Sequence, residues 1–180
     1  MPSRATASTP RPSAVQAEIG QGRPFQSVAQ EATVALLRTA SMVGRALARV
    51  VEPHGLSLAQ YNALRIIRGA GTGGVATLAI RDRMIEEGTT ITRLLDKLER
   101  AGLIVRERDF PDRRQVICRA TADGAALLDR LDPLVDESDA EAVAALDVPT
   151  LEAFIAALDV IRATNTDRGA ARAASRSAAH

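Results

Sequence analysis

The 180-residue chain is poor in aromatic residues, histidine and cysteine: it has no Trp, one Tyr, three Phe, two His and one Cys. A single cysteine excludes an internal disulfide bond. His54, His180 and Cys118 are too few and too scattered for a His-rich or Cys-rich metal site. No apolar run is long enough to cross a bilayer and no secretory leader is recognisable, so we expect a cytoplasmic protein with no membrane partner.

Short motifs that mark common enzyme classes are also missing. The sequence has no Gly-x-Ser-x-Gly, His-Glu-x-x-His, Gly-Lys-Ser/Thr or Cys-x-x-Cys. Neighbouring carboxylates such as Glu86 and Glu87 are more typical of a solvated helix face than of an acid/base pair. The sequence therefore predicts no catalytic residues, no cofactor and no metal.

What the chain does contain is 46% apolar and 25% charged residues, with alanine and leucine prominent. This composition favours a mainly helical fold in a single domain. The net charge of +1 is uninformative, but the charges are unevenly distributed. Between Asp123 and Asp159 every charged residue except Arg130 is acidic, whereas arginines cluster at positions 106, 108, 113, 114 and 119. One part of the molecule is thus suited to face phosphate and another is not.

Apolar spacing predicts helices over 25–51, from about 58, over 75–84, from about 122 and over 149–161. The second should begin at a capping box formed by Ser57 and Gln60. Thr121 is suited to cap the helix that follows it. Residues 1–24 and those after about 165 lack clear apolar periodicity.

The most informative stretch runs from residue 89 to residue 120. Ile91, Leu94, Leu95 and Leu98 fall on one face of a helix. Gly102 follows where a left-handed C-cap is expected. Two strands, up to Arg108 and from Gln115 to Ala120, are then separated by a Pro-Asp turn. A helix facing outward with threonine and arginine, followed by an arginine-tipped hairpin, is a shape suited to reading DNA.

These residues resemble the MarR family of bacterial transcription regulators. The resemblance rests on Thr92 to Glu99 (Thr-Arg-Leu-Leu-Asp-Lys-Leu-Glu), Gly102-Leu103-Ile104 with Arg106, Asp109-x-Pro-Asp-Arg-Arg, and Thr121-x-x-Gly124. Several motifs agree in order and spacing over about residues 57–125, which is more specific than any lone motif. Ala120 departs from the family, which usually has Leu there.

The resemblance implies a mainly α (α+β) fold with a winged helix-turn-helix lobe, a two-stranded wing and terminal dimerisation helices. The implied organisation is a disordered arm (1–24), a MarR-type domain (25–165) and a flexible tail (166–180). Within the domain, 57–120 would form the DNA-binding lobe, and 25–52 and 121–165 the dimerisation helices.

The implied DNA contacts come from two places. Thr89, Thr90, Thr92, Arg93 and Lys97 belong to the reading helix, where Arg93 could bind guanine and the threonines thymine methyls or phosphates. The alternative for Arg93 is a salt bridge with Asp96. In the wing, Arg113 and Arg114 would reach the minor groove, and Asp112 would orient Arg114. Arg106 and Arg108 would stabilise the wing or contact a phosphate.

By the same resemblance we expect a homodimer on a palindromic operator of double-stranded DNA, acting as a ligand-responsive repressor. Its effector would be a small aromatic or phenolic compound bound between the DNA lobe and the dimerisation helices. With so few aromatic residues such a pocket would be thin, and Tyr61 and the first helix are the candidates to line it.

Alternative functions rest on single features. Cys118 alternates with Val116 and Ala120 and could be a buried apolar residue or an oxidation-sensing thiol. The run from Gly69 to Gly74 matches Gly-x-Gly-x-x-Gly, which would make a nucleotide site only if a buried strand preceded it, and Arg65 and Arg68 interrupt that strand. A winged helix that binds only protein is a third possibility.

Overall fold

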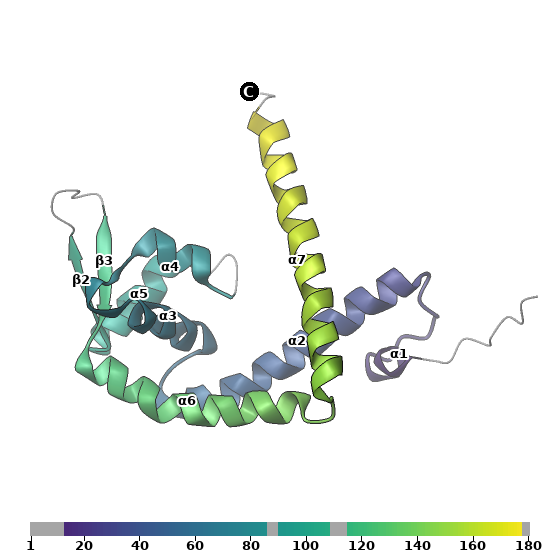
Figure 1. The fold of residues 1–180 in the computed structure, drawn as a ribbon, viewed down its shortest axis with the longest axis horizontal. Helices are drawn as coiled ribbons and strands as arrows, with labels where there is room; N and C mark the ends of the chain where they lie inside the picture. Colours follow the sequence, from purple (N-terminus) through teal and green to yellow (C-terminus); the bar gives the residue numbers. More distant parts are fainter. Residues whose placement is uncertain (1–12, 86–89, 109–114, 178–180) are drawn as a thin grey trace, which may run out of the picture. The chain divides into compact units, whose positions relative to one another are not determined.

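The computed structural model describes residues 13–85, 90–108 and 115–177, with side chains up to residue 166. The chain divides into two compact units, one reaching Val135 and one starting at Asp136. Figure 1 gives the order of the elements along the chain. Among the described residues, no helix is long and apolar enough to cross a membrane.

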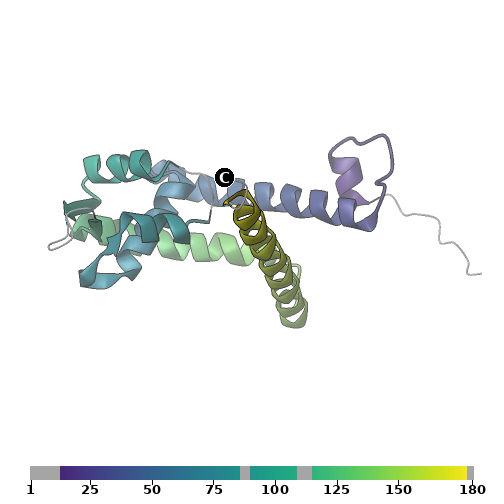
Figure 2. The ribbon, with the colours of Figure 1, turned by 90° about the horizontal axis from the view of Figure 1, so that it is seen from above.

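The first unit opens with a short helix, α1 (Ala14–Glu18), where the sequence predicted a disordered arm; residues 1–12 lie outside the described part. Ser13 caps α1 by accepting a hydrogen bond from the amide of Gln16. Val15 is buried, and Glu18 lies 3.5 Å from Arg38 of the next helix. Figures 1 and 2 both show α1 folded back beside the start of that helix.

The long helix α2 (Val28–Val51) begins three residues later than its apolar spacing predicted, because Ser27 is its N-cap. The hydroxyl of Ser27 accepts a hydrogen bond from the amide of Gln30 at 3.1 Å. A short 3₁₀ turn, η1 (Glu52–His54), ends the helix, and Gly55 follows with φ 82°. That left-handed conformation explains why glycine stands there.

The helix-turn-helix consists of α3 (Leu58–Gly69), α4 (Thr77–Arg83) and α5 (Ile91–Arg100). The predicted capping box is confirmed: the Ser57 and Gln60 side chains each accept a hydrogen bond from the other's backbone amide. After α5, Gly102 has φ 72°, as its predicted role as a C-cap requires.

A small antiparallel sheet has the strand order β1-β3-β2, formed by β1 (Val75–Ala76), β2 (Ile104–Arg108) and β3 (Val116–Ala120). The predicted two-stranded wing is β2 and β3, with Arg106 opposite Cys118. The third strand was not predicted: Val75 and Ala76 leave the expected helix to pair with Cys118 and Ile117. Gly74 has φ 71°, and a Cβ there would lie 2.7 Å from Ile117 Cγ2, so only glycine lets the loop approach β3.

The hydrophobic core joins the end of α2, the helix-turn-helix and the sheet to the helix that follows the wing. Its largest fully buried side chains are Leu64, Ile67, Ile80, Leu95, Leu98, Ile104, Leu128, Leu131, Val51 and Cys118.

The following helix, α6 (Ala122–Val143), is fixed to the wing at its first turn. As predicted, Thr121 caps it, accepting from the amide of Gly124 at 3.0 Å while donating to the Gly102 carbonyl at 2.7 Å. A Cβ on Gly124 would lie 2.1 Å from the carbonyl oxygen of Leu103, so the helix and the wing meet through backbone.

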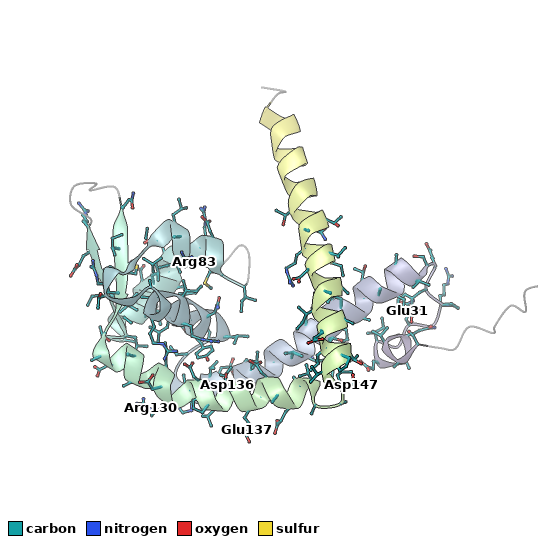
Figure 3. The ribbon with its side chains drawn as sticks, in the orientation of Figure 1. Glu31, Arg83, Arg130, Asp136, Glu137 and Asp147 are labelled. Carbon is teal, nitrogen blue, oxygen red and sulfur yellow. The ribbon has the colours of Figure 1, made fainter. Side chains whose placement is uncertain are left out.

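In the second unit, α7 (Val148–Ser177) begins where Asp147 accepts a hydrogen bond from the amide of Thr150 at 3.0 Å (Figure 3). This bond lowers the pKa of the Asp147 carboxyl. The helix runs on past residue 166, where the sequence predicted a flexible tail. Its last turns are rich in alanine, the residue with the highest helix propensity.

Candidate nucleic-acid interface

The sequence of α5 separates a buried face from a charged, exposed one. Leu94, Leu95 and Leu98 are buried in the core, whereas Thr92, Arg93 and Lys97 are exposed on the opposite side. This is the face that the sequence predicted for reading DNA. Thr90 occupies the N-cap position and is exposed, but its side chain makes no capping hydrogen bond.

Arg93 forms no ion pair or hydrogen bond with any residue that the structure describes. The alternative interpretation, a salt bridge from Arg93 to Asp96, is not realised because Asp96 pairs with Arg106 instead. None of the described residues thus occupies the guanidinium of Arg93, whose side chain is exposed.

Arg106 joins the wing to α5. Its Nη2 atom lies 2.7 Å from Asp96 Oδ1, and its Nε atom donates to Glu99 Oε2 at 2.9 Å. The hydrogen bond from Arg106 lowers the pKa of Glu99, and the same bond raises the pKa of Arg106. Of the two uses predicted for Arg106, these contacts favour support of the wing over a phosphate contact, because both carboxylates of α5 already hold the guanidinium.

The remaining predicted wing residues divide between described and undescribed parts of the chain. Arg108, the last residue of β2, is exposed. Asp112, Arg113 and Arg114, together with Thr89 in front of α5, lie outside the described residues.

Two side chains that position this surface were not predicted from the sequence. Asn62 of α3 accepts a hydrogen bond from the amide of Ile85 at 3.1 Å, which fixes the chain as it leaves α4. Arg119 donates through Nε to the carbonyl of Thr72 at 3.0 Å and pairs with Glu107 at 2.6 Å. These contacts hold the loop of residues 70–74 against the wing. Asn62 carried no signal, and Arg119 was counted only as part of the arginine cluster.

A cavity of about 660 Å³ lies between α4, α5 and the start of β3. Its apolar wall includes Leu78, Ile91 and Val116, and Thr92 and Arg106 provide polar groups. Tyr61, the residue expected to contact an effector, is not among those lining it. Only 4% of Tyr61 is exposed, and its hydroxyl donates to Asp132 at 2.8 Å, so it is a core residue with a satisfied polar group.

The structure also shows the surroundings of Cys118 and of the loop Gly69–Gly74, on which the alternative functions rest. Cys118 is fully buried in β3, and burial raises the pKa of its thiol. Among the described residues, the polar side chain that approaches its sulfur is Thr77, at 3.9 Å. The alternative of a nucleotide site at Gly69–Gly74 lacks the buried strand that it requires, because the residues before this loop form α3.

Comparison with known proteins gives one consistent result. Residues 56–116 match the model of the MarR family. The HTH-type transcriptional regulator TtmR of Methylorubrum extorquens is 32% identical over 120 residues, which is 67% of this chain and 60% of TtmR. This chain thus aligns with less than two thirds of that relative.

Solved structures cover more of the chain. A MarR transcription factor from Planctomyces limnophilus has 33% identity and a TM-score of 0.59, over 76% of this chain and 99% of that one. CouR from Rhodococcus jostii, solved with p-coumaroyl-CoA, has 26% identity and a TM-score of 0.65, over 76% of this chain and 95% of CouR. The family match spans α3, α4, α5 and β2, the elements of the helix-turn-helix and the first half of the wing.

Proposed function

Since this chain belongs to the MarR family, we propose that it is a sequence-specific DNA-binding transcription regulator of the cytoplasm and not an enzyme. It acts as a homodimer on a palindromic operator of double-stranded DNA. Its mode of action is repression that a small ligand relieves.

The observation that carries this proposal is the charge on the exposed face of α5. The helix has two carboxylates, Asp96 and Glu99, and Arg106 of the wing holds both. The cations of the helix, Arg93, Lys97 and Arg100, are all exposed. An α-helix fits the major groove, where an arginine can make a bidentate contact with guanine and a threonine such as Thr92 can contact a thymine methyl.

A dimer is proposed because one such helix reads too few base pairs. Specific affinity usually requires two reading helices about one turn of DNA apart. Apolar side chains that the single chain leaves exposed are available for the partner copy: Val28 (83%) and Leu37 (65%) on α2, and Ile155 (55%) and Val160 (67%) on α7.

The cavity beside α5 is the place where we propose that a small ligand acts. Thr92 belongs both to the cavity wall and to the exposed face of α5. A bound compound there would favour a conformation of α5 that fits DNA less well. Arg81, an exposed arginine of the same lining, would meet an acidic group on the ligand. Leu78, Ile91 and Val116 suit an aromatic ring.

The test begins with selection of duplexes from a random library by the purified protein. Affinity is then measured for the selected operator and for random DNA. Arg93→Ala should reduce discrimination by about 1–3 kcal/mol, the usual worth of a bidentate hydrogen-bond pair between arginine and guanine. Arg100→Ala is the matched control: Arg100 is exposed on the same helix, but at its far end, where its Nε donates to the Asp96 carbonyl at 3.1 Å.

Unchanged discrimination by Arg93→Ala would remove that residue from base reading. Failure of the wild-type protein to enrich any duplex would favour the alternative of a protein-binding winged helix. Footprints of the enriched operator with and without phenolic carboxylic acids test the ligand response in the same material.

A further inference from the structure

Within the first unit, a polar cluster links α3 to the first part of α6. It comprises Tyr61, Arg65, Arg68, Asp129 and Asp132. The hydroxyl of Tyr61 donates to Asp132 Oδ1 at 2.8 Å, and Arg68 Nη2 pairs with Asp132 Oδ2. Arg65 Nε lies 3.9 Å from Asp132 Oδ1, and Arg68 Nη1 lies 3.2 Å from Asp129. Asp132 is thus the residue on which three side chains of α3 converge.

The environment of Asp132 makes this link stronger than an ordinary surface ion pair. The Asp132 side chain is 26% exposed and that of Arg68 30%, whereas Asp129 is 75% exposed. Burial alone would raise the pKa of Asp132, but the hydrogen bonds from Arg68 and Tyr61 outweigh it and the pKa is lowered. The carboxylate is therefore ionised at neutral pH, with both of its oxygens engaged.

The position of Asp132 along α6 allows it to influence the direction of that helix. The first turn of α6 is already attached to the wing, where Gly124 lies against the Leu103 carbonyl. Asp132 comes eight residues later, about 12 Å along the helix axis. Leu128 and Leu131 hold α6 against the core between these two points, but apolar packing is not directional. The hydrogen bond and ion pairs of Asp132 add directional contacts that fix the angle of α6 relative to α3.

The direction of α3 in turn fixes the reading helix. Leu64 and Ile67 of α3 share the buried core with Leu95 and Leu98 of α5, and the two helices are in direct contact. A change in the angle between α3 and α6 would therefore turn α5 relative to α6.

We propose that Asp132 is a positioning residue for DNA binding: it holds the direction of α6 relative to α5 and thereby sets the half-site spacing that the dimer accepts. This inference rests on the proposed function, since α6 continues into the region assigned to dimerisation. Asp132 itself does not contact DNA.

The experiment compares wild-type protein with Asp132→Asn, which removes the charge but keeps an oxygen that can accept from Tyr61. Asp129→Asn is the matched control, because it removes the exposed carboxylate that contacts the same arginine. Each protein is titrated with the selected operator, with operators whose half-sites are two base pairs closer or farther apart, and with a single half-site.

We expect Asp132→Asn to reduce the preference for the selected spacing by about tenfold, the effect of roughly 1.4 kcal/mol. Its affinity for the single half-site should stay within about twofold of wild type, and Asp129→Asn should keep the wild-type spacing preference. A purely structural role would instead lower the affinity for all duplexes together. An unchanged spacing preference, or an equal loss on the single half-site, would overturn the proposal.

Two further measurements keep the proposal open to disproof. If Asp132→Asn does not fold, Arg68→Gln tests the same link from α3 with the same expected and contrary results. If wild-type protein enriches no operator, the proposed function fails separately. Amide hydrogen exchange without DNA then tests whether Asp132 holds α3 and α6 together. Asp132→Asn should speed exchange in α3 and in the first half of α6, and unchanged exchange would refute this role of Asp132.

Discussion

Arg106 of β2 donates through Nε to the carboxylate of Glu99 on α5, with 2.9 Å between the two atoms, and so couples the wing to the reading helix. The bond lowers the pKa of Glu99. A carboxyl group whose pKa is lower in the folded state contributes stability above its unfolded pKa and loses that contribution as pH falls through the folded value. Below the ordinary value of 4.5 the link between wing and helix should therefore weaken.

We accordingly predict that Glu99→Gln lowers the melting temperature at pH 7 and that its difference from wild type is smaller at pH 3. Thermal unfolding followed by circular dichroism at both pH values measures this. Glu137→Gln is the control, because Glu137 is exposed on α6 and has no partner among the described residues (Figure 3). An equal difference at both pH values would mean that the charge of Glu99 contributes nothing.

Gly74 and Gly71 make a matched pair for testing the loop that precedes β1. Both have positive φ, 71° and 64°, but only Gly74 is crowded: its added Cβ would lie 2.8 Å from the Cys118 carbonyl oxygen. Gly71→Ala should cost about 1 kcal/mol for the left-handed backbone. Gly74 has φ 71° and ψ −174°, a backbone conformation that is almost restricted to glycine. Gly74→Ala combines this strain with overpacking and should cost about 2–4 kcal/mol in total. Equal costs in urea unfolding would show that the close approach to β3 is unimportant.

Much of the lobe was predictable because its signals are local. The apolar spacing of Ile91 to Leu98, the Ser57–Gln60 capping box, Gly102 at the C-cap and Thr121 before α6 each lie within a few residues of what they determine. All four are present in the structure. The exposed positions of Thr92, Arg93 and Lys97 follow directly from the helical period.

The features that were missed depend on contacts between different elements of the fold. Strand β1 exists because Val75 pairs with Cys118, and a two-residue strand has no period of its own. Arg106 was interpreted as a wing or phosphate residue because charge alone does not reveal a partner on the opposite element. Tyr61 was considered for a ligand pocket because its actual partner, Asp132, lies 71 residues away and could not be identified from the sequence.

The wing arginines remain a prediction from the sequence, because they lie between β2 and β3 and outside the described residues. Arg113→Ala combined with Arg114→Ala should weaken binding to operator and random DNA alike. The plot of log affinity against log salt should become shallower by about one unit for each phosphate that these arginines neutralise. Arg130→Ala, which removes an exposed arginine from α6 (Figure 3), is the control. An unaltered slope in the double variant would exclude the wing from the DNA interface.

Cys118 provides the test that separates a ligand-responsive regulator from an oxidation sensor. The thiol is fully buried, and because burial raises its pKa it carries little thiolate at neutral pH. It should therefore react slowly with 5,5′-dithiobis(2-nitrobenzoic acid) in native protein and rapidly in urea, and hydrogen peroxide should leave operator affinity unchanged. Cys118→Ala, which should cost about 1 kcal/mol because it removes a buried sulfur, is the control. Release of DNA by peroxide in wild type but not in Cys118→Ala would establish oxidation sensing instead.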